Sequence, residues 1–174
     1  MTSLPLHPIL VHFPIAFAVL LPFVLCTVAF LIWKRNWPAR TWWTAIAFCG
    51  LFALSALISV KSGERDEELV EAVVSEQVIH HHEEMGERVV QGAVLLFLIS
   101  LGPLFTSRRS LFYGLSLGIS LLCLGLTLAA GHSGGELVYR HGAASAYAQT
   151  GQLEGAVDTS IIETGDREED KDDD

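Results

Sequence analysis

The stretch of sequence that decides the fold occupies residues 8–33 and reads PILVHFPIAFAVLLPFVLCTVAFLIW. It contains no aspartate, glutamate, lysine or arginine, and about twenty apolar residues suffice to cross a lipid bilayer as a helix. Further apolar stretches follow at residues 42–60, 89–105 and 110–131, and 51% of all residues are hydrophobic. The sequence therefore predicts four membrane crossings and an integral membrane protein.

The charges divide between the two ends of these crossings. Because each crossing reverses direction, the start of the first, the end of the second, the start of the third and the end of the fourth share one face. All seven histidines and all twenty carboxylates can be placed on that face. The two connections at the other face carry only cations: Lys34, Arg35, Arg40, Arg108 and Arg109. By the positive-inside rule we expect these connections to be cytoplasmic and both termini to lie outside, in a bacterial cytoplasmic (inner) membrane.

We accordingly expect an all-α fold, with residues 1–142 forming an integral membrane four-helix bundle in contact with the lipid bilayer. Apolar residues at helical spacing between positions 64 and 88 predict a short extracytoplasmic amphipathic helix. Gly114 and Gly118 have the small-xxx-small spacing that lets helices approach closely, which favours a compact bundle.

The end of the chain is expected to lie outside the membrane. The glycine-rich block at residues 131–142 is too polar to cross lipid, so we expect it to fold back over the outer mouth of the bundle. Residues 143–174 form a C-terminal extension whose acidic tail is expected to be disordered.

Several classes of protein are disfavoured. Cys26, Cys49 and Cys123 each lie in an apolar stretch, so no disulfide framework is expected, and the Cys-x-x-Cys-His motif of c-type haem attachment is absent. The basic residues form no patch outside the short connections, which argues against nucleic-acid binding. The apolar stretches contain no carboxylate or lysine, which argues against a proton pump or ion transporter.

Histidines gather at the outer helix ends. His12 lies about one turn inside the first apolar stretch, His132 closes the fourth, and His82 shortly precedes the third. An ionisable side chain at a membrane edge usually faces the bundle interior and has a partner. Neutral imidazole ligates haem iron, copper and zinc, so these positions indicate a cofactor site. The ordinary alternative is that His80 and His81 lie on a solvated helix face and that His7 only caps the first helix.

The leading hypothesis is a redox subunit resembling a b-type cytochrome, which binds haem b and exchanges electrons with a quinone or an extracytoplasmic partner such as a cytochrome. We expect His12 and His132 to be the axial ligands, with His82 and either His7 or His141 as the next pair. The other candidate cofactor-binding residues are His7, His82, His141 and Arg140, the arginine through a haem propionate.

Two alternatives stay open. The first is a non-haem membrane protein in which His12, His82 and His132 bind an iron, copper or zinc ion, helped by Glu83 or Glu136. The second is a structural membrane subunit without a cofactor, whose acidic outer face docks a partner. A stand-alone enzyme is less favoured than an electron-transfer or metal-binding protein, because a serine beside a histidine in sequence is not by itself a nucleophile with its base.

Three blocks of the sequence resemble a known family. They read LHPILVHFPIA at residues 6–16, HEEMG at residues 82–86 and GHSGGELVYRHG at residues 131–142. These blocks are similar to the predicted bacterial membrane proteins filed as domain of unknown function number 2231, over residues 6 to about 142. The resemblance implies a four-helix membrane domain without a settled activity, sometimes found joined to or near redox proteins and cytochromes. It matches at five histidines: His7, His12, His82, His132 and His141.

Overall fold

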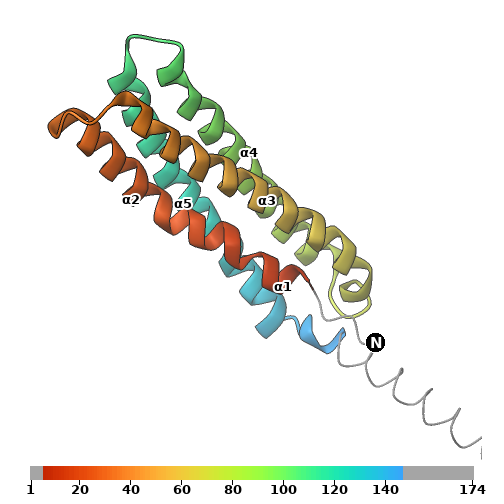
Figure 1. Ribbon diagram of the computed structural model, residues 1–174. Coiled ribbons are helices and arrows are strands. Elements are labelled where there is room, and N and C mark those ends of the chain that lie inside the picture. Colours follow the sequence, from red (N-terminus) through yellow and green to blue (C-terminus); the bar gives the residue numbers. More distant parts are fainter. Residues whose placement is uncertain (1–5, 147–174) are drawn as a thin grey trace, which may run out of the picture.

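The computed structural model describes residues 6–146, and within them the chain forms four long helices joined by short turns (Figure 1). The elements are α1 (His7–Leu10), α2 (His12–Lys34), η1 (Ala39–Thr41), α3 (Trp42–Val70), α4 (Glu76–Leu101), η2 (Gly102–Leu104) and α5 (Arg109–Tyr139). All four long helices are apolar and long enough to cross a membrane, which confirms the predicted all-α four-helix bundle. The acidic tail lies outside the described residues.

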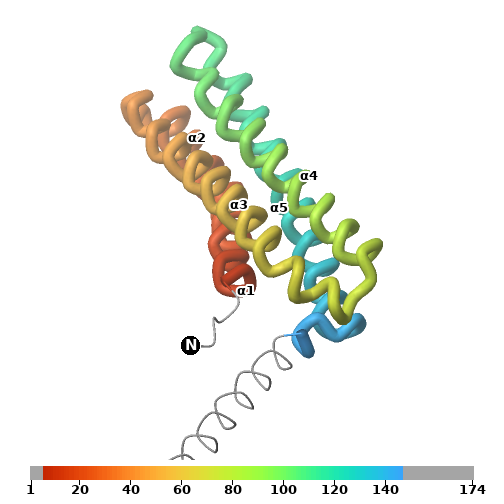
Figure 2. The backbone as a smooth tube through the Cα atoms, turned by 90° about the vertical axis from the view of Figure 1, so that its right-hand side faces the viewer, coloured from red at the N-terminus to blue at the C-terminus, as the bar shows by residue number. Residues whose placement is uncertain are grey.

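The long helices form a ring in chain order, in which α2, α3, α4 and α5 each pack against the next and α5 packs against α2. The α2–α3 and α4–α5 connections lie at one end of the bundle, which we call the basic end after Lys34, Arg35, Arg40, Arg108 and Arg109 (Figures 1 and 2). The α1 turn, the α3–α4 connection and the end of α5 lie at the other end, which we call the histidine end.

The bundle interior combines large apolar side chains with small residues. Leu21, Leu25, Phe52 and Leu96 are fully buried, whereas many other leucines and phenylalanines point outwards. Such an outward apolar surface suits contact with lipid, where each helix satisfies its own backbone hydrogen bonds.

The helices are longer than the membrane is thick. α3 has 29 residues and α5 has 31, which at 1.5 Å per residue gives about 44 and 46 Å, against a hydrocarbon core of about 30 Å. A second cluster of buried apolar residues lies at the histidine end, beyond the main core: Val74, Ile79, Leu137 and Ala143. The ends of α3, α4 and α5 at the histidine end therefore pack around a small apolar cluster of their own.

This extension differs from two predictions. The apolar residues between positions 64 and 88 do not form a separate surface helix, because they continue α3 to Val70 and begin α4 at Glu76. The block at residues 131–142 does not fold back at once, since α5 stays helical to Tyr139. Packing against α4 gives the outer part of α5 a partner, and tertiary packing readily overrides the low helix propensity of glycine.

The prediction that Gly114 and Gly118 bring the helices of the bundle together is wrong. A Cβ atom built on either residue would meet nothing within 4 Å, so both face away from the other helices. The tight contacts lie at other glycines, because a Cβ on Gly92 would come 3.1 Å from Cys123 Sγ and one on Gly50 would come 3.3 Å from Phe97. Spacing alone does not show which face of a helix packs.

Candidate functional site

Two histidines from distant parts of the chain meet at the histidine end. His7, on α1, and His82, on α4, have ring centroids 6.1 Å apart and planes inclined at 85°. Both side chains are half-buried between the helices. Pro8 occupies the first turn of the short α1 helix, where a missing backbone N–H costs nothing. The His7 backbone N–H also points to Asp66 Oδ2, at 3.4 Å.

Hydrogen bonds fix the tautomer of His7. Its Nδ1 atom lies 2.9 Å from the Ser59 carbonyl oxygen and 3.2 Å from Ser62 Oγ. A carbonyl oxygen can only accept, and Ser62 Oγ already donates its proton to that same carbonyl, at 2.6 Å. His7 Nδ1 must therefore carry a proton and donate it. In the neutral imidazole, the lone pair then resides on Nε2.

The same reasoning applies to His82. Its Nδ1 atom lies 2.8 Å from Ser133 Oγ, and that hydroxyl donates its only proton to the Ala130 carbonyl oxygen, at 2.9 Å. Ser133 Oγ therefore accepts from His82 Nδ1, which again leaves the lone pair on Nε2. Among residues 6–146, the side-chain hydrogen bonds of both rings that are resolved to an atom are made by Nδ1, and the Ala130 carbonyl oxygen is a further acceptor beside the His82 ring. Each imidazole thus offers its Nε2 lone pair as a donor.

Glycines allow both rings to lie directly against a helix backbone. A Cβ atom on Gly63 would come 3.2 Å from Cε1 and Nδ1 of His7, and one on Gly134 would come 3.0 Å from Cε1 of His82. Carbon atoms pack best at about 3.5–4.0 Å, so any larger residue would push the ring away. The hydrogen-bonding serine precedes the glycine in each case, so each ring rests on a Ser-Gly pair of a neighbouring helix.

The arrangement occurs once in each half of the chain. In the first half, His7 stands before a hairpin of two helices and Ser62-Gly63 lies near its end, with 55 residues between His7 and Ser62. In the second half, His82 lies near the start of the α4–α5 hairpin and Ser133 follows 51 residues later. Each hairpin therefore contributes one imidazole and one Ser-Gly pair against which an imidazole packs. The separations of 55 and 51 residues differ, but a histidine followed by Ser-Gly at the other end of a helical hairpin recurs in both halves, and this order is the signal of the pair in the sequence.

The structure places the other predicted site residues on the surface. His12 is exposed on α2, and it forms no hydrogen bond or ion pair with any described residue. The His132 side chain is 79% exposed, and its Nε2 lies 3.8 Å from Glu136 Oε1. That oxygen also accepts from Arg140 Nη1, at 2.7 Å. His141 is exposed just after α5. The role of His12 and His132 as axial ligands stays a prediction.

His132 and Arg140 do share a shallow hollow on α5. Its volume is about 330 Å³, and Gly131, His132, Gly135, Glu136, Tyr139 and Arg140 line it. Neither His7 nor His82 contributes to this hollow.

No complete metal site is formed by protein side chains alone. Among residues 6–146, no group of three or more His, Cys, Asp or Glu side chains is placed so that it could hold a metal ion. The set of His12, His82 and His132 is therefore not brought together in the described bundle. The pair of His7 and His82 offers two donors, which suits a cofactor that carries its remaining donors itself.

Comparison with known proteins identifies the family of the chain but does not indicate an activity. The model of a family described as "Predicted membrane protein (DUF2231)" matches residues 3–146. No curated protein and no solved structure matches the chain.

Proposed function

This chain belongs to the DUF2231 family of predicted membrane proteins, and we propose that it is a redox subunit that binds one haem b through His7 and His82. The haem would lie at the histidine end of the bundle and exchange electrons there with a quinone or an extracytoplasmic partner. The observation that carries the proposal is the pair of imidazoles, 6.1 Å apart, each with Nδ1 hydrogen-bonded and the lone pair on Nε2.

The distance between the rings suits two ligands of one metal atom. An imidazole nitrogen would bind a transition metal at about 2.0–2.1 Å, and the 6.1 Å between the two ring centroids also lies in the usual range of an edge-to-face ring contact. Histidines that bind metals commonly donate their other ring N–H to a carbonyl or a similar acceptor, which fixes the ring and raises its basicity. The Ser59 carbonyl and the Ser133 hydroxyl have this position.

The number of protein donors favours haem over a bare metal ion. Zinc and non-haem iron sites use three or four protein ligands, and no such group exists among residues 6–146. A haem would need only two imidazoles from the protein, which His7 and His82 would supply, because the porphyrin brings its own nitrogen donors. When bound, it would supply one-electron chemistry, while the protein would hold the two imidazoles and shield the iron from water.

Room for the macrocycle depends on α1. The two hollows described on the surface do not include the histidine pair, so the rings must separate from their present neighbours to admit a porphyrin. α1 is suited to this movement, since it has only four residues, buries none of them and is divided from α2 at Val11. Displacing it would break the hydrogen bonds of His7 to Ser59 and Asp66 and its contact with Gly63, so haem binding would have to replace these contacts.

The location also bears on the electron path. No histidine of the chain lies in the basic half of the bundle, so the protein offers no second imidazole pair across a core of about 30 Å. Electrons would enter and leave at the histidine end.

The test is to express the protein with ample haem, purify it in detergent, and record oxidised and dithionite-reduced spectra with a pyridine haemochrome assay. We expect one haem b per chain, with a sharp reduced α-band. His7→Ala and His82→Ala should each abolish the bis-histidine spectrum. His12→Ala and His132→Ala are matched controls at the same end and should retain it.

Other results would contradict the proposal in different ways. Loss of haem in the two controls, with retention in the His7 and His82 variants, would show that the exposed histidines are the ligands. A folded wild-type protein that contains no haem would show that the pair only joins the helix ends, as expected of a structural subunit. Elemental analysis of the same sample would detect a bound metal ion.

A further inference from the structure

The basic end of the bundle carries positive charge that no carboxylate among residues 6–146 balances. Five cations lie there: Lys34, Arg35, Arg40, Arg108 and Arg109. The first carboxylate in the chain is Glu64, and none lies between Glu87 and Glu136, so every carboxylate in the described helices belongs to the opposite end. Accordingly, none of the five cations forms an ion pair within residues 6–146. Their counter-charge therefore does not come from residues 6–146.

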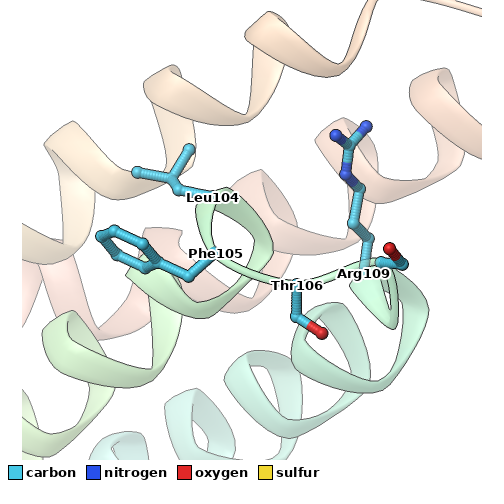
Figure 3. Close-up of a pocket in the computed structure, with 5 residues that line it drawn as sticks. Leu104, Phe105, Thr106 and Arg109 are labelled. Atoms are coloured by element: carbon cyan, nitrogen blue, oxygen red, sulfur yellow. The ribbon is translucent and has the colours of Figure 1, made fainter.

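One of these cations lines a hollow. The α4–α5 connection borders a depression of about 460 Å³, lined by Leu104, Phe105, Thr106, Ser107 and Arg109. Leu104 and Phe105 extend on one side, Arg109 extends on the other, and Thr106 lies on the connection between them (Figure 3). The Thr106 hydroxyl accepts the Arg108 backbone N–H at 3.2 Å, which steadies the turn. The hollow therefore has an apolar wall and a cationic wall.

The start of α5 adds to the positive potential. α5 begins at Arg109 and has no acidic residue in its first turn. The first backbone N–H groups of a helix have no partner within it, and the helix dipole places partial positive charge there. Anions are favoured at such a point, and here a guanidinium, which binds phosphate in a forked geometry, stands beside it.

Tryptophans place this end at the depth of lipid headgroups. All four tryptophans lie within or beside the α2–α3 connection, and three of them are exposed: Trp33, Trp37 and Trp43. Indole rings prefer the membrane–water interface. The Lys34 ammonium lies 4.3 Å from the Trp33 ring centroid, as expected where chain and headgroup meet.

We propose that the hollow at residues 104–109 binds an anionic phospholipid. Arg109 and the Ser107 hydroxyl would bind the headgroup phosphate, and Leu104 and the exposed Phe105 would contact the acyl chains. A phospholipid is favoured over a free phosphate ion because two of the five lining residues, Leu104 and Phe105, are apolar and exposed. It is favoured over an acidic protein because the tryptophans place the hollow at the bilayer surface. The site lies at the opposite end from the histidine pair and does not depend on haem.

The native tryptophans report on lipid at this end. The full-length protein would be reconstituted in phosphatidylcholine vesicles that contain a rising fraction of phosphatidylglycerol. In one series the phosphatidylglycerol is brominated and in the other the phosphatidylcholine is brominated. Bromine quenches tryptophan fluorescence on contact, so quenching reports which lipid lies beside the tryptophans. One basic residue near an anionic surface contributes a binding free energy of about 1 kcal/mol, which corresponds to a preference of about five-fold. We therefore expect brominated phosphatidylglycerol to quench with an apparent affinity about five-fold above that of brominated phosphatidylcholine.

Matched variants distinguish a site from general attraction. Arg109→Gln should reduce the preference to nearly one, whereas Arg108→Gln removes the same charge from the adjoining residue, which does not line the hollow, and should keep most of it. Equal effects of the two variants, or no preference in the wild type, would overturn the proposal. Competition with inorganic phosphate uses the wild-type protein and so does not depend on the folding of a variant. At equal ionic strength, we expect phosphate not to displace the brominated phosphatidylglycerol. Displacement of the lipid would show a free-phosphate site instead.

Discussion

Replacing Gly134 with alanine should displace the His82 ring from its contact with the α5 backbone. The new Cβ atom would lie 3.0 Å from Cε1 of His82, whereas carbon atoms pack best at about 3.5–4.0 Å. The ring must therefore retreat by a few tenths of an ångström, which lengthens and weakens the 2.8 Å hydrogen bond between His82 Nδ1 and Ser133 Oγ. Overpacking of this kind costs about 1–3 kcal/mol. The better helix propensity of alanine offsets about 0.8–1.0 kcal/mol, so the net loss should be about 0–2 kcal/mol.

Gly135→Ala is the matched control, because it makes the same change one residue later on the same helix. A Cβ atom there meets nothing within 4 Å, so this variant should gain about 0.8–1.0 kcal/mol from helix propensity alone. The free energies of unfolding would be measured by dodecyl sulfate titration in mixed micelles, followed by circular dichroism. The two variants should differ by about 1–3 kcal/mol. Equal stability of both would refute the conclusion that the His82 ring lies against the α5 backbone.

Two further comparisons use the same unfolding titration. Trp42→Phe removes the buried indole N–H that donates to the Ser100 carbonyl oxygen at 2.8 Å, so stability should fall by about 1–3 kcal/mol. The exposed Trp43→Phe should change it by less than about 0.5 kcal/mol, and similar losses in both would contradict the importance of that hydrogen bond. Gly92→Ala places a Cβ atom 3.1 Å from a buried cysteine sulfur and should destabilise by up to about 2 kcal/mol after the propensity gain. Gly118→Ala meets nothing within 4 Å and should be neutral or stabilise by up to about 1 kcal/mol, so a clear loss there would show that lipid-facing glycines pack against something.

The four helices and the division of charge between their ends were predictable from the sequence. Each depends on a local property: a run of about twenty apolar residues crosses a bilayer wherever it stands in the chain. The basic and acidic connections alternate because consecutive crossings reverse direction. The outer extension of α3, α4 and α5 was not predictable in this way. The residues between positions 64 and 88 are polar enough for a surface helix, and only the packing of Val74 and Ile79 against Leu137 and Ala143 shows that they prolong the bundle.

Sequence by itself determined that histidines gather at one end, because depth along a helix follows from residue number. Only the tertiary structure decided which of them face inwards. Each residue turns an α-helix by about 100°, so neighbours at one depth point in different directions. Ser133 is accordingly buried while His132, one residue earlier, is exposed. His7 and His82 face each other because Gly63 and Gly134, on other helices, leave room for their rings, and the fit between a ring and a gap on another helix exists only once the helices have packed.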